Sequence, residues 1–183
     1  LENHPKRDQF LAAHPIAGTE FSGPQAAHKG LFQGKPQIIC ESNKTRPDLL
    51  LWAKQTFRQM GMYLRFMEAE AHDKHMAYVS HLSHISSFML GKTVLEKEED
   101  ENNIFDLAGS GFESTVRLAK SSPAMWTPIF EQNKDNVIET LDAYIQNLEH
   151  FKSLLVKDDY EALFLEMKNT NQLTSILNGI SKK

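Results

Sequence analysis

Apolar and polar positions in the first 70 residues alternate between strand-like runs and one helical pattern. The strand-like runs cover residues 9–13, 35–41 and 62–67. Short apolar runs of this length are typical of strands buried in a sheet. Residues 49–60 instead repeat apolar side chains at helical spacing, after a start signal at Thr45, Pro47 and Asp48 and before a stop at Gly61. Strand, helix and strand in this order predict the last part of an α/β domain.

The pattern changes at about residue 70, where strand signals stop. Residues 71–90 contain no proline or glycine and carry apolar residues throughout their length, which predicts a long, largely buried helix ending at Gly91. The charged run 97–103 predicts a solvated loop. Further helices are expected over residues 112–120, 123–132, 137–155 and 160–177. We therefore expect an α/β part over residues 1–70 and an all-helical domain over residues 71–183.

Composition excludes several classes of protein. The 183 residues include 20 basic and 24 acidic side chains, a net charge of −4 that gives no general attraction to nucleic acid. No apolar stretch approaches the roughly 20 residues that span a bilayer. The single cysteine, Cys40, lies in an apolar run, which predicts a buried structural thiol and a reducing, cytoplasmic environment. The first residue is Leu1, so we expect the chain to be part of a longer protein.

The segment 13–23 combines a histidine, a proline, two glycines and a hydroxyl–carboxylate pair. We expect His14 at the carboxyl end of the first strand, the edge of an open α/β sheet where ligands bind. A neutral histidine there can act as a general base. The alternative is a histidine that only caps a turn.

Four histidines between residues 71 and 90 suggest either a metal site or a polar patch. They are His72, His75, His81 and His84. On a regular helix, at about 100° per residue, the second pair points roughly 120° to 180° away from His72, so the four cannot bind one metal ion. Two of them, completed by another helix, still could. On the same helix His81 and His84 share a face, where a polar patch would meet ligand, water or a partner.

Arg117 and Trp126 are the other candidates for binding. An arginine in an apolar amphipathic stretch fits either a structural salt bridge or an acidic ligand held bidentately. Trp126 fits a core or interface anchor. The sequence from Gly109 to Gly111 begins like a dinucleotide fingerprint, but Ser114 stands at its last position and no strand precedes it.

Several motifs together resemble the prephenate dehydrogenase family in order and spacing. They are residues 14–20 (HPIAGTE), His72-Asp73, residues 80–84 (SHLSH), Gly111-Phe112, residues 117–119 (RLA) and Met125-Trp126. The resemblance covers residues 10 to 155 and lacks the family's glycine fingerprint. It implies the last strands of a Rossmann-type dinucleotide-binding domain, followed by a helical domain for substrate binding and dimerisation.

The resemblance also implies an activity, NAD-dependent oxidative decarboxylation of prephenate to 4-hydroxyphenylpyruvate in tyrosine biosynthesis. His14 matches the histidine that contacts the substrate hydroxyl, and Arg117 matches the arginine that binds a substrate carboxylate. Thr19 and Glu20 match residues at the entrance, whereas His81, His84 and Trp126 are expected to line the pocket from the helical side. The expected partners are prephenate and a second copy of the chain, with no metal, nucleic acid or membrane.

Glu113 departs from the family, because many members carry a basic residue at this position. Carboxylate recognition is therefore expected to depend more heavily on Arg117. Two alternatives stay open: an arogenate dehydrogenase, and a non-catalytic helical interaction module. Because the phosphate-binding turn is missing, we predict that residues 1–183 alone show no NAD binding by calorimetry and no activity.

Overall fold

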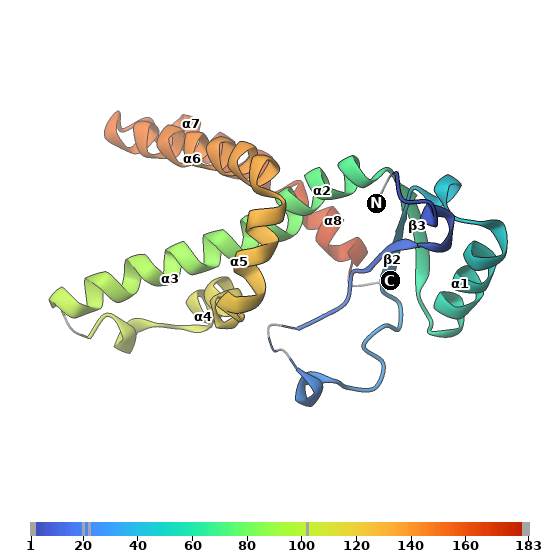
Figure 1. The fold of residues 1–183 in the computed structure, drawn as a ribbon. Helices are drawn as coiled ribbons and strands as arrows, with labels where there is room; N and C mark the ends of the chain where they lie inside the picture. Colours follow the sequence, from blue (N-terminus) through green and yellow to red (C-terminus); the bar gives the residue numbers. More distant parts are fainter. Residues whose placement is uncertain (1–2, 20, 22, 102, 181–183) are drawn as a thin grey trace. The chain divides into compact units, whose positions relative to one another are not determined.

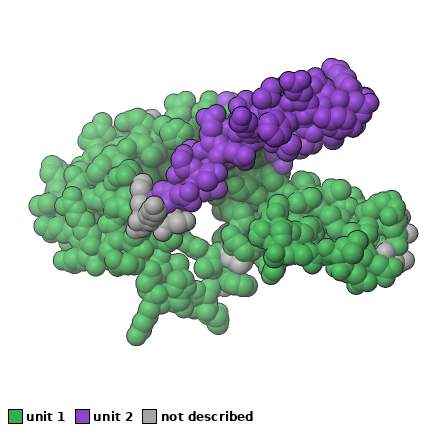
Figure 2. Space-filling model, turned by 180° about the vertical axis from the view of Figure 1, so that it is seen from behind, with its two compact units in different colours: residues 1–137 green, residues 138–183 purple. Residues whose placement is uncertain are grey.

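The computed structural model describes residues 3–19, 21, 23–101 and 103–180. The chain forms two compact units, Leu1–Val137 and Ile138–Lys183, which Figure 2 colours separately and which are described here one by one. A small sheet with helices makes up the first unit, and the described residues of the second unit are helical. The structure therefore confirms an α/β part followed by a helical part.

Three strands form one sheet within the described part of the chain. They are β1 (Ala12–Pro15), β2 (Pro36–Cys40) and β3 (Tyr63–Met67), in the order β1-β2-β3. The central strand is the most buried, and Ile39 has no exposed surface. Cys40 at its end is buried as predicted, and burial raises the pKa of its thiol.

The first strand differs from the prediction in position and burial. Residues Arg7–Gln9 form a 3₁₀ turn, and β1 begins only at Ala12, with half-buried and exposed residues in alternation. This strand pairs antiparallel with β2, placing His14 opposite Ile38, whereas β2 and β3 are parallel. His14 does lie near the carboxyl end of its strand, as predicted, but the antiparallel pairing places that end of β1 at the amino ends of β2 and β3.

Helix α1 (Pro47–Gln59) lies beside the sheet and packs on it through Ala53 (Figure 1). Pro47 occupies its first turn as predicted, since proline has no N–H to leave unsatisfied there. Thr45 does not cap it, because its hydroxyl donates to the carbonyl of Phe10 at 2.9 Å. Gly61 ends the helical segment with a φ of +80° that strongly favours glycine.

A long continuous helical segment follows the sheet (Figure 1). It consists of α2 (Ala69–Met76), the π-helical turn η4 (Ala77–His81) and α3 (Leu82–Glu101). The predicted end at Gly91 is wrong, and the predicted loop is wrong for residues 97–101, which are helical, whereas residue 102 lies outside the described residues. The segment is also less buried than expected, since most of its side chains are partly or fully exposed.

Charged side chains explain why α3 continues beyond Gly91. Lys92 pairs with Glu96, and Lys97 pairs with Glu101, each four residues apart on the helix surface. The Glu98 carboxylate accepts hydrogen bonds from the backbone N–H groups of residues 103, 104 and 105 at 2.7–3.2 Å. The charged run therefore stabilises a helix end instead of forming a loop.

The rest of the first unit packs short helices beside α3. They are α4 (Ser110–Val116), the 3₁₀ turn η6 (Arg117–Lys120) and α5 (Pro123–Gln132). Ser87 on α3 donates to the carbonyl of Thr115 at 2.7 Å, which joins α3 to α4. Other 3₁₀ turns are η2 (Pro24–Ala26), η3 (Ser42–Lys44) and η5 (Phe105–Leu107).

The second unit contains α7 (Tyr160–Thr170), α8 (Leu173–Ile180) and most of α6 (Lys134–Val156). The single helix predicted over residues 160–177 is therefore wrong. Residues 171–172 form a turn, in which the N–H of Gln172 donates to the carbonyl of Asn169 at 3.2 Å, and α8 begins at Leu173. No helix among the described residues is long and apolar enough to cross a membrane.

Candidate active site

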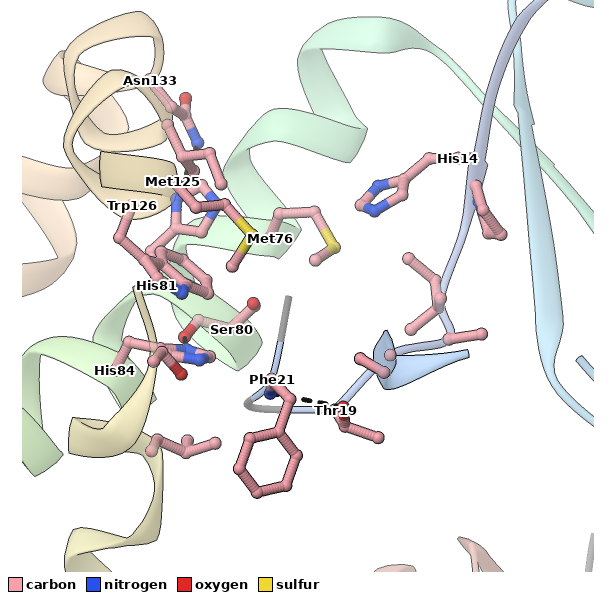
Figure 3. Close-up of a pocket in the computed structure, with 18 of the residues that line it drawn as sticks. His14, Thr19, Phe21, Met76, Ser80, His81, His84, Met125, Trp126 and Asn133 are labelled. Atoms are coloured by element: carbon pink, nitrogen blue, oxygen red, sulfur yellow. Dashed lines mark hydrogen bonds between the residues drawn. The ribbon is translucent and has the colours of Figure 1, made fainter. Parts of the chain in front are cut away.

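A cavity of about 890 Å³ lies within the first unit. Its walls come from β1 and the loop after it, from α2, η4 and α3, and from η6 and α5. Six of the seven residues predicted from the sequence line it: His14, Thr19, His81, His84, Arg117 and Trp126. Glu20, the seventh, lies outside the described residues. Figure 3 shows His14 on one side of the cavity, across from Trp126 and the other two histidines.

His14 contacts a second histidine, His72, which the sequence suggested as a possible metal ligand and as part of a family motif. Its Nδ1 lies 2.9 Å from Nε2 of His72, and Nδ1 of His72 lies 2.8 Å from a carboxylate oxygen of Asp73. Both His72 and Asp73 line the same cavity. Three side chains from a strand and a helix therefore form one hydrogen-bonded series.

The π turn explains how histidines along one helical segment reach the same cavity. A regular helix would direct His81 and His84 away from His72. One extra residue in the turn shifts the later positions by about 100°, which reduces these angles to about 80° for His81 and about 20° for His84. The cavity is lined by all three, but not by His75. Turns of this kind often mark functional sites.

His84 is held by a backbone bond and an aromatic stack. Its Nδ1 donates to the carbonyl of Ser80 at 2.9 Å, so its Nε2 is the unprotonated nitrogen when the ring is neutral. The ring stacks on Trp126, with centroids 3.6 Å apart. Trp126 is 7% exposed and therefore forms a rigid wall beside the histidine.

His81 has the opposite arrangement of ring protons. The carboxamide nitrogen of Asn133 donates to its Nδ1 at 3.3 Å, which places the proton of the neutral ring on Nε2. The same nitrogen donates to the backbone carbonyl of Asp73 at 2.8 Å. Asn133 thus ties the end of α5 to α2 and orients His81 at once.

Burial favours the neutral form of three of the four histidines that line the cavity, His14, His81 and His84. It lowers the pKa of His14, of His81 and of His84, because a buried ring is harder to charge. After burial, the neighbouring groups act in both directions. His72 lowers the pKa of His14 and His84 lowers that of His81, and Asp73 raises both to a smaller extent. The bond to the Ser80 carbonyl raises the pKa of His84, and Arg117 lowers it to a smaller extent. Neutral imidazoles can accept or donate hydrogen bonds, and a neutral His14 can accept a proton.

Other polar groups complete the wall formed by η6 and α5. Arg117, at the start of η6, brings a guanidinium to the cavity. The Ser121 hydroxyl and the Trp126 indole nitrogen are buried and have no hydrogen-bond partner among the described residues. Unpaired buried donors cost free energy, which favours a site that a polar ligand completes. On the loop, the Thr19 hydroxyl accepts from the N–H of Phe21 at 3.3 Å.

The described residues contain no cluster of three or more histidine, cysteine, aspartate or glutamate side chains arranged to hold a metal ion. His75 lies on an exposed part of α2. A pair of histidines does meet, but it joins His14 to His72 by a direct hydrogen bond between ring nitrogens. This geometry is suited to proton transfer.

Sequence reasoning missed three residues of the site: His72, Asp73 and Asn133. The first two form one of the family motifs, but their contact with His14 joins positions 58 residues apart, and spacing along one helix gives no sign of it. Asn133 directly follows the end of α5, a position where an asparagine gives no sign of a functional site. A carboxylate directly after a histidine was the one local signal available.

Two family models match the chain almost end to end. Residues 1–65 match a model described as prephenate dehydrogenase, nucleotide-binding domain. Residues 68–169, more than half of the chain, match one described as prephenate dehydrogenase, dimerization domain. The chain belongs to the prephenate dehydrogenase family. The resemblance predicted from the motifs is confirmed.

Individual relatives agree with this assignment. The chain is 30% identical over 168 residues to a prephenate dehydrogenase of Bacillus subtilis, covering 90% of this chain and 44% of the relative. It is 27% identical over 164 residues to a cyclohexadienyl dehydrogenase of Zymomonas mobilis, covering 89% and 56%. The chain therefore spans about half the length of these curated relatives.

Solved structures of the family share the fold. Prephenate dehydrogenase from Aquifex aeolicus, crystallised with hydroxyphenyl propionate and NAD+, superposes with a TM-score of 0.84 at 34% identity, covering 93% of this chain and 59% of that one. Arogenate dehydrogenase from Synechocystis gives 0.77 at 26% identity, covering 92% and 62%. The small sheet and the helices that follow it are thus features of the prephenate dehydrogenase family.

Proposed function

We propose that residues 1–183 supply the substrate cavity and the catalytic histidine of a dehydrogenase that oxidatively decarboxylates prephenate to 4-hydroxyphenylpyruvate, with NAD as oxidant. The observation that carries the proposal is the meeting of His14, His81, His84 and Arg117 around one cavity, although they are spread over 100 residues of sequence. Membership of the prephenate dehydrogenase family supports the reaction class. We also propose that the substrate domain begins at residue 71.

His14 acts as the general base in this proposal. As the ring carbon of prephenate loses hydride, its hydroxyl becomes a carbonyl, and Nε2 of His14 takes the hydroxyl proton. Loss of carbon dioxide then makes the ring aromatic. The base must be neutral beforehand, and burial provides this by lowering the pKa of His14. The protein's main task is to position the hydroxyl against this nitrogen.

The two carboxylates of prephenate require cationic or donor groups. Arg117 is proposed to bind one of them through its forked guanidinium. His81, whose neutral ring carries its proton on Nε2, is proposed as a further donor, and His84 and Trp126 as the wall against the ring. Thr19 and Glu20 are proposed to lie at the entrance.

The residues present fit one part of NAD. The cavity next to His14 is at the upper end of the range of about 300–1,000 Å³ that small-molecule sites occupy, so a nicotinamide ring fits beside a substrate. Residues 1–65 match a nucleotide-binding domain, but the described residues contain no glycine-rich turn between a strand and a helix for the phosphates. When bound, NAD supplies the hydride acceptor.

Arogenate is the second candidate substrate, because the fold and sequence also match an arogenate dehydrogenase and a cyclohexadienyl dehydrogenase. Arogenate has an amino group where prephenate has a keto group. The roles proposed above for His14, Arg117, His84 and Trp126 concern groups that both substrates share. Substrate preference is therefore decided by the assay below.

The test is formation of reduced cofactor by residues 1–183 joined to a complete nucleotide-binding domain. We expect turnover with prephenate and NAD, less with arogenate or with NADP, and release of carbon dioxide in equal amount. His75→Asn, an exposed histidine outside the cavity, serves as the matched control for cavity variants. Turnover with arogenate alone would make arogenate the substrate in place of prephenate. No turnover with either would refute the proposal in favour of a non-catalytic interaction module.

A homodimer is also proposed. The matched family domain is described by its dimerization, and α6, α7 and α8 expose many apolar side chains. They include Ile145, Leu148, Phe151, Leu155, Phe164, Leu165, Met167, Ile176 and Leu177. An apolar surface of this extent marks an interface. Sedimentation equilibrium should give twice the 20.9 kDa mass of one chain, whereas a monomer at all concentrations would contradict the dimer.

A further inference from the structure

We propose that His72 and Asp73 are positioning residues that hold the proton of His14 on Nδ1 and leave Nε2 of His14 open to the cavity as the base. The inference deepens the proposed function, since it specifies which nitrogen of His14 can take the substrate's proton. It stands on two hydrogen bonds, 2.9 Å between His14 and His72 and 2.8 Å between His72 and Asp73.

The proton positions follow from which groups can donate. An ionised Asp73 carboxylate only accepts, so Nδ1 of His72 must carry a proton. A neutral His72 then has an unprotonated Nε2, which can only accept from His14. Nδ1 of His14 must therefore be the donor, and the remaining lone pair of a neutral His14 lies on Nε2. The series leaves one tautomer of His14 compatible with both bonds.

The ring geometry agrees with this direction. The centroids of His14 and His72 lie 5.1 Å apart and the rings are inclined at 68°, so the rings meet edge to edge through their nitrogens and do not stack. Within the described residues, Nε2 of His14 has no hydrogen-bond partner, and His14 points into the cavity (Figure 3). The nitrogen that the series leaves unprotonated is thus the one available to a ligand.

Each member of the series is held by the fold. His14 is fixed by pairing of β1 with the buried central strand, opposite Ile38. The α2 turn that carries Asp73 is held from α5, because Asn133 donates to the Asp73 carbonyl at 2.8 Å. In many active sites a nucleophile bonds to a base, and a third group orients that base. Here the base itself, His14, bonds to an orienting histidine, His72, which in turn bonds to the carboxylate of Asp73.

The two positioning residues contribute unequally. The His72 side chain is 16% exposed, whereas that of Asp73 is 57% exposed. Water competes for an exposed carboxylate and screens its charge. We therefore expect removal of His72 to have a larger effect on His14 than removal of the Asp73 carboxylate.

The chain itself provides the first test, without any activity. Nitrogen-15 labelling of its eight histidines allows the proton-bearing nitrogen of each ring to be read from long-range nitrogen–proton spectra at about pH 8, above the ordinary histidine pKa. His14→Gln identifies the His14 signals by their loss. We expect His14 in the Nδ1–H form, and a predominant Nε2–H form would overturn the proposal.

Variants at residue 72 then show whether His72 is the cause. His72→Phe removes the acceptor and should release His14 into a mixture of tautomers, whereas His72→Gln keeps an amide oxygen as acceptor and should retain Nδ1–H. His84 is an internal control, because the Ser80 carbonyl sets its tautomer and should keep it unchanged. An unchanged His14 in His72→Phe would refute the role of His72. If His72→Phe does not fold, the wild-type tautomer still decides.

Kinetics on residues 1–183 joined to a complete nucleotide-binding domain give the second readout. His72→Phe should lower kcat about ten- to a hundredfold, the usual worth of a group that orients a functional histidine, with KM nearly unchanged. His72→Gln should recover most of the loss. Equal loss in both variants, or a change in KM alone, contradicts a positioning role. A wild type without turnover refutes the proposed function but leaves the tautomer result standing.

Discussion

The two walls of the cavity present histidines in contrasting surroundings. On the sheet side, His14 bonds to a side-chain series that ends in a carboxylate. On the helical side, His84 bonds to a backbone carbonyl, stacks on an indole and lies near Arg117. Burial lowers the pKa of His14, of His81 and of His84 alike, so burial alone does not assign their roles.

The hydrogen-bond partners of the rings separate them. His14 bonds to His72 and through it to the Asp73 carboxylate, whereas His84 bonds to the Ser80 carbonyl and lies near the Arg117 guanidinium. A proton gained by His14 therefore lies at one end of a hydrogen-bonded series that ends in a carboxylate, whereas the charge of Arg117 favours an anion beside His84. The contrast teaches that hydrogen-bond partners, more than burial, divide similar rings into a base and a binding surface.

The largest expected effect comes from His14→Asn. An asparagine keeps a polar side chain but cannot accept the hydroxyl proton, so kcat should fall about 10²- to 10⁴-fold, the usual worth of a general base, while KM changes little. The same change at His84 should act mainly on KM. Steady-state assays of both variants, with His75→Asn as the control, test whether His14 acts on kcat and His84 on KM. Similar losses of kcat in both variants would remove the distinction between the two walls.

Arg117→Lys is expected to have the next largest effect. Lysine keeps the charge but loses the planar fork that matches a carboxylate. Loss of one charged hydrogen bond corresponds to about 1.5–3 kcal/mol, so KM should rise about ten- to a hundredfold with kcat nearly unchanged. Lys120→Arg, at the other end of η6, is the control for charge and helix effects. An unaltered KM would show that Arg117 binds no carboxylate.

Local patterns predicted much of the fold. The runs at β2 and β3, the proline at the start of α1 and the bounds of α5 agree with the structure because each depends on residues close in sequence. The start of β1 and the continuation past Gly91 differ, since they depend on strand pairing and on side-chain bonds such as those of Glu98. The break after Thr170 is a short turn at residues 171–172, which the apolar periodicity does not encode.

The residues of the candidate site were more predictable than the hydrogen bonds between them. Six described residues named from the sequence do line one cavity. The bond between His14 and His72 was not predictable, because it joins a strand to a helix across 58 positions. Nor was the π turn, since hydrophobic spacing assumes a regular helix and the extra residue changes which side chains share a face.

A smaller effect is expected from Trp126→Phe. Phenylalanine fills most of the space and keeps a ring against His84, but it buries less area, so the free energy of unfolding should fall by about 1–2 kcal/mol. Its loss of the indole N–H costs nothing in the free chain, because that group has no partner among the described residues. Urea unfolding measures the change. A loss above about 4 kcal/mol would instead indicate that the whole helical wall depends on the indole.

The smallest effect concerns acid stability. Burial lowers the pKa of His81, so the unfolded chain binds a proton more readily than the folded one. The contribution of a neutral His81 to stability is full above its ordinary pKa of about 6.5 and is lost as the pH falls through the lowered value. His81→Asn keeps an acceptor for Asn133 but cannot titrate. Its melting temperature should therefore fall less than that of the wild type between about pH 7.5 and pH 5.5, with His14 and His84 still titrating in both. An equal fall in the two proteins would mean that folding does not lower the pKa of His81. Burial would then not be what keeps the histidine of the helical wall neutral.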